Sequence, residues 1–253
     1  MTILVKIGTT LLTTPSGNLD LKNLSQLVDQ LSECVKSNQK VIIVTSGAIT
    51  CGAKLMKDIP IKVAEKQAAA SIGQLLLMNK YANFFSHYKI HIGQLLLTKD
   101  GLLDPSRRVN ALNTINTLLR KNFIPIINEN DSVTTKEIKF GDNDELSSIV
   151  AVMCNVSHYI ILSDIDGVFT DDPKTNKDAK LIPKIHKVTE DIRIKAKDSK
   201  SKFGSGGMGS KLKAAEYAMT HGIQVTIANG RNKNVIRQII QNEKIGTTFQ
   251  KLN

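Results

Sequence analysis

Short apolar runs alternate along the chain with longer segments whose apolar residues recur at helical spacing. The runs are rich in Ile, Val and Leu and lack polar residues at alternate positions, which is typical of strands buried on both faces of a parallel sheet. This pattern predicts strands at Ile3–Ile7, Val41–Thr45, His91–Leu97, Ile124–Asn128, Tyr159–Ser163 and Gln224–Ala228.

The segments between these runs predict helices. In the first segment, Leu24, Leu27 and Leu31 fall on one face, and Asp20 precedes it as a residue that can cap a helix N-terminus. Because strands and helices alternate, we expect an α/β fold with a mostly parallel sheet. The other helices are predicted at about Val63–Phe85, Arg107–Lys121, Asn143–Asn155, Gly209–His221 and Val235–Gln241.

The composition is that of a globular protein that folds around its own core. Of the 253 residues, 41% are hydrophobic and 23% charged, which excludes wholesale disorder. The N-terminus has no signal-peptide pattern, and no apolar run approaches the ~20 residues that span a bilayer. Cys34, Cys51 and Cys154 are widely spaced and odd in number, so we expect neither a disulfide framework nor a zinc site. A cytoplasmic protein with no membrane partner is expected.

The formal net charge of +11 raises the question of a polyanionic partner. Clustered Lys and Arg release counterions from nucleic-acid phosphates, but only 4% of the residues are aromatic and no Trp is present to stack on bases. We therefore expect no nucleic-acid partner and keep nucleic-acid binding as a minor alternative. Residues 174–213 hold 12 Lys and Arg against 4 Asp and Glu, so most of the excess charge lies in one irregular segment.

Small polar residues follow one predicted strand after another. In parallel α/β folds ligands bind at the carboxyl ends of the strands. The recurrence of these residues therefore predicts a binding site at that edge, although any single one could be a turn former. They are found at Lys6–Gly8, Thr45–Gly47, Asn128–Asp131, Ser163–Asp164 and Asn229–Gly230.

A glycine-rich stretch, FGSGGMGSK at 203–211, opens one of the predicted helices. Glycines allow backbone amides to approach phosphate oxygens, and a helix N-terminus favours an anion. The spacing misses that of a P-loop, because Lys211 comes one position late and Leu212 stands where a hydroxyl is needed. We predict an anion-binding loop that is not a P-loop.

The stretch SDIDGVFTDD at 163–172 allows a second interpretation. It is similar to the first motif of haloacid-dehalogenase-type phosphatases, in which Asp164 is the phosphoryl acceptor and Asp166 the acid/base, next to Mg²⁺. That family needs further acidic motifs later in the chain, and no acidic pair follows a later apolar strand here. The phosphatase alternative is therefore the weaker one.

Carboxylates and amides are concentrated at 128–132 (NENDS) and 141–145 (GDNDE). They suit a small zwitterion, because a carboxylate can take an ammonium group while amides take carboxylate oxygens; solvated turns are the alternative. His87 and His91 have the i, i+4 spacing of a metal pair. Because His91 begins a predicted strand, we expect both histidines to be structural or exposed.

Taken together, these stretches resemble the amino-acid kinase family, and within it the members that phosphorylate glutamate. The kinases of that family that act on acetylglutamate, carbamate or uridylate are the nearest alternatives. The resemblance implies a three-layer α/β/α sandwich around a mostly parallel, twisted sheet. It is carried in family order by VKIGTTLL (5–12), VIIVTSGAI (41–49), IHIGQLLLT (90–98), IPIINENDSV (124–133), IKFGDNDELS (138–147), LSDIDGVFTDDP (162–173) and GSGGMGSKLKAAE (204–216).

The chain departs from the family pattern in three places. Ser163 stands where Thr is usual, and GSGGMGSK replaces a GTGGMSTK-like loop. Many members continue into a C-terminal PUA domain, an RNA-binding-type module, whereas this chain is expected to be a single kinase domain over 1–253. Its acceptor-binding half is expected at about 1–158 and its nucleotide-binding half at about 159–253.

The resemblance implies transfer of the ATP γ-phosphoryl group to the side-chain carboxylate of L-glutamate, giving γ-glutamyl phosphate and ADP, the first step of proline biosynthesis. Mg²⁺ is expected to be held mainly by the ATP phosphates. The acceptor is anionic at pH 7, with an ordinary pKa of ~4.3, so no general base is needed. A homo-oligomer and functional coupling to glutamyl-phosphate reductase are also implied.

The resemblance also assigns roles to residues at matching positions. Catalytic roles are expected for Lys6, Lys211, Asp144, Gly8 and Gly47. Glutamate binding is expected for Ser46, Asp131 and Asn143. Nucleotide binding is expected for Lys6, Ser163, Asp164, Ser205, Gly206, Gly207, Met208, Gly209, Ser210 and Lys211.

Overall fold

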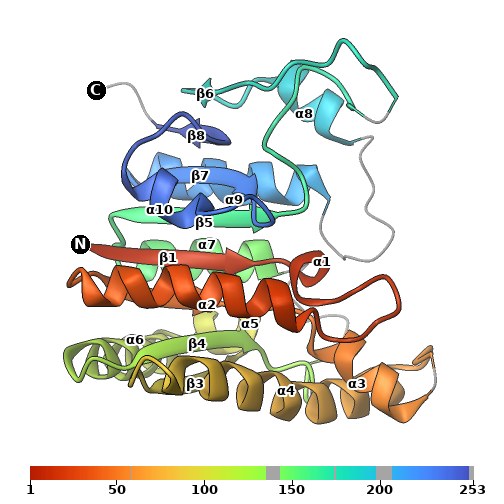
Figure 1. Ribbon diagram of the computed structural model, residues 1–253, viewed down its shortest axis with the longest axis vertical. Helices are drawn as coiled ribbons and strands as arrows, with labels where there is room; N and C mark the ends of the chain where they lie inside the picture. Colours follow the sequence, from red (N-terminus) through yellow and green to blue (C-terminus); the bar gives the residue numbers. More distant parts are fainter. Residues whose placement is uncertain (58, 135–142, 174, 198–206, 251–253) are drawn as a thin grey trace.

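One sheet runs through the protein. The structure is a computed structural model and describes residues 1–57, 59–134, 143–173, 175–197 and 207–250. In the described residues the sheet has eight strands in the order β3-β4-β2-β1-β5-β7-β8-β6 (Figure 1). All neighbours are parallel except β7 and β8. The strands are β1 (Thr2–Ile7), β2 (Lys40–Val44), β3 (Ile92–Leu97), β4 (Ile124–Glu129), β5 (His158–Ser163), β6 (Lys184–Ile185), β7 (Gln224–Asn229) and β8 (Thr247–Phe249).

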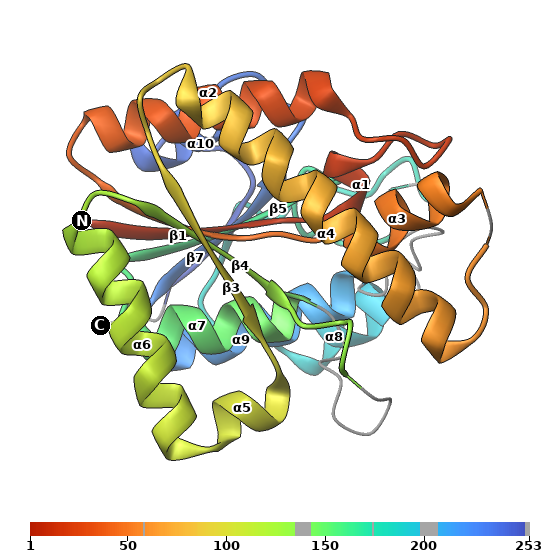
Figure 2. The same cartoon turned by 90° about the horizontal axis from the view of Figure 1, so that it is seen from below.

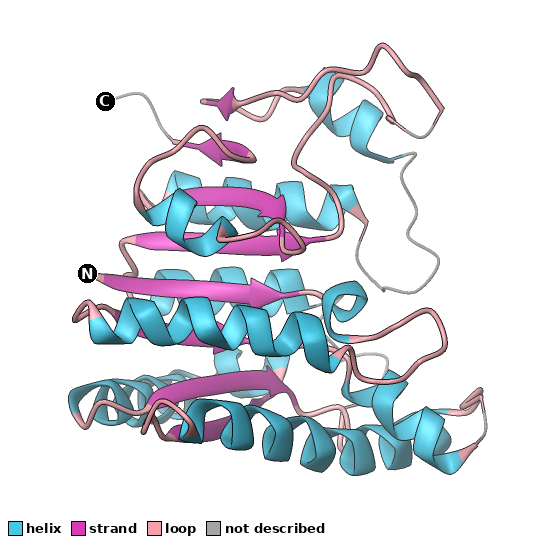
Figure 3. Ribbon diagram, in the orientation of Figure 1, coloured by secondary structure: helices cyan, strands magenta, loops and turns pink. Residues whose placement is uncertain are grey.

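Helices cover both faces of this sheet, as Figure 2 shows most clearly. In that view α2, α4 and α10 lie on one side and α6, α7 and α9 on the other, and Figure 3 shows the alternation of helix and strand. The three-layer α/β/α prediction is therefore confirmed. The helices are α1 (Thr9–Leu12), α2 (Leu21–Lys36), α3 (Ala48–Met56), α4 (Val63–Ser86), α5 (Lys99–Leu103), α6 (Pro105–Arg120), α7 (Asn143–Met153), α8 (Glu190–Lys197), α9 (Met208–Thr220) and α10 (Val235–Ile240).

The core is divided in two by the sheet because successive strand residues point to opposite faces. On β1, Ile3 and Val5 pack with α2, α4 and α10, whereas Leu4 packs with α7 and α9. All three side chains are fully buried. A central strand must be apolar on both faces for this arrangement, which explains the uninterrupted runs in the sequence.

Helices α3 and α4 cross with their backbones in direct contact. A Cβ atom on Gly52 would lie 1.8 Å from the carbonyl oxygen of Ala69, and one on Gly73 would lie 1.9 Å from that of Ala48. No other residue type fits at these two positions. The crossing fixes the beginning of α3, which follows directly on the carboxyl end of β2.

The predicted strands and helices are all present, with ends displaced by one or two residues. Asp20 caps α2 by accepting a hydrogen bond from the Asn23 amide at 3.1 Å, as predicted. His87 and His91 are both exposed, and the His91 ring lies 5.5 Å from that of Phe123. Elements that the pattern did not predict are short or amphipathic only in part: α1, α3, α5, α8, β6 and β8.

Among the described helices, none combines the length and the apolar character that crossing a bilayer would demand.

Candidate active site

The carboxyl ends of the parallel strands meet at one edge of the sheet and bring polar residues together there. Lys6 on β1 pairs with Val44 on β2 and Ile161 on β5, so the residues after these three strands are spatial neighbours. Thr45, Ser46 and Ser163 are all buried at this edge. Groups that are far apart in the sequence therefore share one site, as predicted from the strand ends.

Asp144 lies at the centre of this site, between two lysines. Its Oδ1 is 2.5 Å from the Lys6 ammonium and its Oδ2 is 3.2 Å from the Lys211 ammonium. The carboxylate is fully buried, and the two lysine side chains are 6% and 8% exposed. The predicted set of Lys6, Lys211 and Asp144 is thus brought into direct contact.

The charge of Asp144 is stabilised by its neighbours against the cost of burial. Burial by itself raises the pKa of this carboxyl, but the ammonium groups of Lys6 and Lys211 and the hydroxyl of Ser210 outweigh it and lower the pKa from 3.8 to about 2. Counted over these three side chains alone, the formal charge is +1. Buried ammonium groups of this kind are able to attract an anion.

Asp144 is placed by the first turn of α7 and is supported from the sheet side. The hydroxyls of Ser147 and Tyr159 contact each other, and both lie within hydrogen-bond distance of the Asp144 carbonyl, at 2.9 and 3.4 Å, so their two hydrogens serve these three contacts. Tyr159 is fully buried on β5, the strand beside β1. This support holds the start of α7 against the sheet, so the carboxylate has little freedom to move.

Lys211 and Ser210 come from the N-terminus of α9. Gly207 is the N-cap residue, and the Ser210 hydroxyl donates to its carbonyl at 3.0 Å and to Asp144 Oδ2 at 2.8 Å. Met208 is buried, and no described atom lies within 4 Å of a Cβ built on Gly209. The nucleotide-binding expectations for Ser205 and Gly206 lie outside the described residues.

The two predicted glycines, which follow β1 and β2, differ in conformation. Gly47 is the N-cap of α3 and has φ +93°, a left-handed conformation that favours glycine. Gly8 is the N-cap of α1, and its amide donates to the Leu162 carbonyl at 3.3 Å. A Cβ on Gly8 would lie 3.9 Å from Lys6 Nζ, so the missing side chain leaves room beside the ammonium group.

The predicted acceptor residues lie on the β2 and β4 side of the cluster. Asn143 Nδ2 donates to the Thr45 carbonyl at 2.7 Å and to Ser46 Oγ at 2.9 Å. Asn128 Oδ1 lies 2.8 Å from the same nitrogen, so the two hydrogens of the Asn143 NH₂ group are shared among three acceptors. Asp131 is half-buried in the turn after β4, where the amide of Thr134 bonds back to the Asn130 carbonyl.

Ser163 and Asp164 occupy the carboxyl end of β5, as predicted. Ser163 is buried and donates to Asp164 Oδ1 at 3.2 Å, while Asp164 itself is exposed. Asp166 accepts hydrogen bonds from the side chains of Asn229 and Asn232 at 3.0 and 3.4 Å. Asp166 thus joins the loops after β5 and β7, which is a structural role.

Within the described part of the chain, no group of three or more His, Cys, Asp or Glu side chains could hold a metal ion. Asp144, the carboxylate described at the centre of the site, is held by Lys6 and Lys211.

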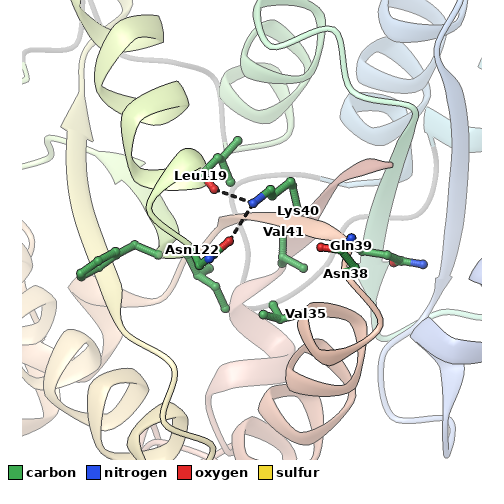
Figure 4. Close-up of a pocket in the computed structure, with 9 residues that line it drawn as sticks. Val35, Asn38, Gln39, Lys40, Val41, Leu119 and Asn122 are labelled. Atoms are coloured by element: carbon green, nitrogen blue, oxygen red, sulfur yellow. Dashed lines mark hydrogen bonds between the residues drawn. The ribbon is translucent and has the colours of Figure 1, made fainter.

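A separate small pocket lies at the amino ends of β2 and β4 (Figure 4). There Lys40 Nζ donates to the Leu119 carbonyl and to Asn122 Oδ1, both at 2.8 Å. The pocket lies at the opposite edge of the sheet from Lys6 and belongs to no predicted site.

Gln74, on α4, takes part in the site although the sequence pattern did not single it out. It is 8% exposed and accepts a hydrogen bond from Asn128 Nδ2 at 2.8 Å. The signal in the sequence that could have pointed to Gln74 is a glutamine in the middle of an apolar helical face. Ser147 and Tyr159 were missed for the same reason, since nothing local distinguishes them from residues of an ordinary amphipathic segment.

The arrangement of the chain is that of known small-molecule kinases. UMP kinase from Bacillus anthracis superposes with a TM-score of 0.69 at 19% identity, covering 100% of this chain and 96% of that one. Isopentenyl phosphate kinase from T. acidophilum gives a TM-score of 0.68 at 16% identity, covering 99% of this chain and all of that one. At these identities the likeness concerns the fold.

Sequence comparison is more specific. The amino acid kinase family matches residues 1–229, and the chain belongs to that family. It is 44% identical over 253 residues to the glutamate 5-kinase of Proteus mirabilis, covering 99% of this chain and 69% of that protein. It is 43% identical to the glutamate 5-kinase of Clostridium acetobutylicum, covering 98% of this chain and 93% of that protein.

Proposed function

We propose that this protein transfers the γ-phosphoryl group of ATP to the side-chain carboxylate of L-glutamate, producing γ-glutamyl phosphate and ADP. The observation that carries the proposal is the buried Lys6–Asp144–Lys211 cluster in a chain 44% identical to a glutamate 5-kinase over nearly its whole length. The reaction is the first step of proline biosynthesis from glutamate.

The reaction needs no proton transfer. A carboxylate oxygen of glutamate forms a bond to the γ-phosphorus while the bond from that phosphorus to the β,γ-bridging oxygen breaks, and the electron pair leaves with ADP. Because the acceptor is already ionised at neutral pH, the difficulty is to bring two anions together while charge spreads over the transferred group. Positioning and fixed positive charge are therefore the contributions expected from the protein.

Lys6 and Lys211 supply that charge. Asp144 neutralises one of the two ammonium groups and holds both in place, and the remaining positive charge faces the phosphates. Because the cluster is buried, its attraction for an anion is weakened less by water and salt than that of an exposed pair. Phosphoryl oxygens are assigned to the backbone at Gly8 and Gly47; at Gly8 a phosphoryl oxygen would share the amide with the Leu162 carbonyl, which accepts from it at 3.3 Å.

The acceptor pocket is formed by Ser46, Asp131 and Asn143. The Asp131 carboxylate and the Asn143 amide oxygen take the ammonium group of glutamate, and the Ser46 hydroxyl takes a carboxylate oxygen. Their positions at the ends of β2 and β4 and the start of α7 support this assignment. This side of the site belongs to the proposed acceptor-binding half, residues 1–158.

ATP binds on the side of β5 and α9, in the proposed nucleotide-binding half, residues 159–253. Ser163, Asp164 and the segment from Ser205 to Lys211 hold it, and the N-terminus of α9 favours the phosphates. Mg²⁺ neutralises phosphate charge and is held mainly by the phosphates themselves. The donor set described above, in which Asp144 is occupied by two lysines, supports this.

Three further expectations belong to this proposal. The protein is cytoplasmic, which suits its free cysteines, of which Cys34 and Cys51 are buried. It forms homo-oligomers. Its product is a reactive acyl phosphate, so coupling to a glutamyl-phosphate reductase would limit loss of the product to water.

The acceptor is tested by measuring ADP release with ATP and Mg²⁺ across L-glutamate, N-acetyl-L-glutamate, aspartate, carbamate and UMP. We expect turnover with L-glutamate alone. Hydroxylamine added to the reaction converts an acyl phosphate to a hydroxamate, so hydroxamate formation equal to ADP release distinguishes carboxylate phosphorylation from ATP hydrolysis. Turnover with another acceptor, or ADP release without hydroxamate, would contradict the proposal.

A further inference from the structure

Gln74 is a buried polar side chain that the catalytic proposal does not use. It lies on α4, directly after Gly73, at the point where α4 touches the backbone of Ala48. That contact brings α4 close enough for the Gln74 amide to reach the carboxyl end of β4. A glutamine that is 8% exposed in such a position needs hydrogen-bond partners to offset its desolvation.

Its partners form a chain of three side-chain amides that leads to the acceptor pocket. Asn128 Nδ2 donates to Gln74 Oε1 at 2.8 Å, and Asn143 Nδ2 donates to Asn128 Oδ1, also at 2.8 Å. Asn128 is 2% exposed, so the middle of the chain is shielded from water. In such surroundings the hydrogen bonds that link the three amides are electrostatically stronger than in water.

Backbone groups determine which way each amide is turned. Asn128 Oδ1 accepts from the Glu129 amide at 2.9 Å, so Asn128 must present its NH₂ group to Gln74. Gln74 must therefore present its oxygen to Asn128. At the other end the Thr45 carbonyl, an acceptor only, requires the NH₂ group of Asn143.

The chain leaves one defined group at each end. Asn143 Oδ1 and Gln74 Nε2 are buried and have no hydrogen-bond partner among the described residues. Because Asn143 Nδ2 is held by Thr45, Ser46 and Asn128, its oxygen is the group left for a ligand. An acceptor atom there suits the ammonium group of a zwitterion.

We propose that Gln74 is a positioning residue for the acceptor pocket, which acts through Asn128 to fix the orientation of the Asn143 amide. The inference deepens the proposed function and rests on it for the identity of the substrate. Loss of Gln74 leaves Asn128 Nδ2 buried without its acceptor, and Asn128 can then rotate away from Asn143. The consequence is weaker binding of the amino-acid substrate with little effect on ATP.

The test compares Gln74→Met with Gln30→Met. Methionine keeps the length and bulk of the side chain and removes both amide groups. Gln30 is also 8% exposed, and its amide oxygen accepts a hydrogen bond from the Ile236 backbone amide at 2.9 Å. This contact joins α2 to α10 and lies away from the site. Gln30 Nε2 also donates to the Gln26 carbonyl at 3.2 Å, so the control variant loses at least as many hydrogen bonds as Gln74→Met at the same degree of burial.

We expect Gln74→Met to raise the KM for glutamate about tenfold, the size of one buried hydrogen bond, while the KM for ATP and kcat stay within about twofold. Gln30→Met should leave both KM values unchanged. Its loss of thermal stability should be similar to that of Gln74→Met. Added to Asn143→Ala, Gln74→Met should raise the KM for glutamate no further. A glutamate KM that changes no more than in Gln30→Met, or an equal rise in both KM values, would overturn the proposal.

A failure of the proposed function is recognised separately, from absence of glutamate-dependent turnover in the wild-type protein. In that case the orientation itself is measured in crystal structures of the wild type and of Gln74→Met. The proposal holds if Asn143 Nδ2 leaves the Thr45 carbonyl in the variant only. It is wrong if Asn128 and Asn143 keep their hydrogen bonds without Gln74.

Discussion

The absence of a side chain on Gly73 is what allows α4 to touch Ala48. A Cβ atom at Gly73 would lie 1.9 Å from the Ala48 carbonyl oxygen, inside any permitted contact, and the obstacle is backbone that cannot swing aside. Ala48 is the first residue of α3 and follows Gly47, which is placed beside the proposed phosphoryl site. Packing between two helices thus decides the position of a loop that we propose binds the phosphoryl group.

Gly73→Ala should therefore destabilise the protein by about 2–4 kcal/mol, the cost of forcing an overpacked contact apart. Chemical denaturation gives the free energy of unfolding directly. Gly209→Ala is the control: it is also a helical glycine, but no described atom lies within 4 Å of the added Cβ, so stability should stay level or rise slightly. Equal stability of Gly73→Ala and wild type would show that the helices can separate at little cost.

Lys6→Met should lower kcat by about 10²–10³, because a preorganised cation is lost from the transition state. The fold should remain, since Asp144 keeps Lys211 and Ser210 as partners. Steady-state kinetics with ATP and glutamate, together with circular dichroism, checks both points. Lys40→Met removes an equally engaged lysine at the opposite edge of the sheet and should leave kcat unchanged. Near-normal turnover in folded Lys6→Met would remove this lysine from the mechanism.

Asp131→Ala and Asp164→Ala should each raise the KM for one substrate, glutamate in the first case and ATP in the second. Asp131, beside β4, is assigned to glutamate, so its loss should raise the KM for glutamate far more than that for ATP. Asp164, at the end of β5, is assigned to the nucleotide, so its loss should do the reverse. Initial rates measured while each substrate is varied in turn separate the two. If either variant moved both KM values together, its assignment to one half of the site would be wrong.

Because His158 is buried, we expect the free energy of unfolding to depend on pH for a reason unrelated to catalysis. Burial lowers the pKa of this imidazole from 6.5 to about 4, and its Nε2 pairs with Thr226 Oγ1 at 2.9 Å. Between these two values the unfolded chain binds a proton that the folded protein does not. Stability should therefore be complete above about pH 6.5 and fall as the pH drops toward 4, by roughly 2–3 kcal/mol for this group.

Replacing the imidazole tests this. His158→Gln should flatten the dependence of unfolding free energy on pH between about 6.5 and 4, measured by urea denaturation at several pH values. His87→Gln alters an exposed histidine and should leave the curve as in the wild type. Parallel curves for wild type and His158→Gln would show that folding does not lower the pKa of His158.

Local pattern was sufficient for the main strands and helices because burial on both faces of a sheet demands uninterrupted apolar runs. The local pattern missed α3. The buried residues of this helix are Ala48, Cys51 and Gly52, which are too few to form a recognisable apolar face, and its stability depends on contact with α4. The local pattern missed β8 and β6 because strands of three and two residues carry too few side chains for a pattern. Each of these elements is stabilised by neighbours that lie far away in the sequence.

The same division holds for the site. The chemical types that a phosphoryl-transfer site needs, including Lys6, Asp144 and Lys211, could be named from motifs, since those motifs are local. That Asp144 bridges the two lysines is a property of the fold, because residues 6, 144 and 211 meet only when β1, α7 and α9 are packed together. Gln74 and Tyr159 carry no motif at all.

The sequence by itself determined the layers, the direction of the sheet, the family and the kinds of group at its carboxyl edge, because hydrophobic periodicity and short motifs record burial and local chemistry. Only the tertiary structure decided which of those groups touch, how deeply they are buried and which way their amides face. Those properties arise from contacts across long sequence separations, and the crossing at Gly73 and the turn of the Asn143 amide are two that no local pattern encodes.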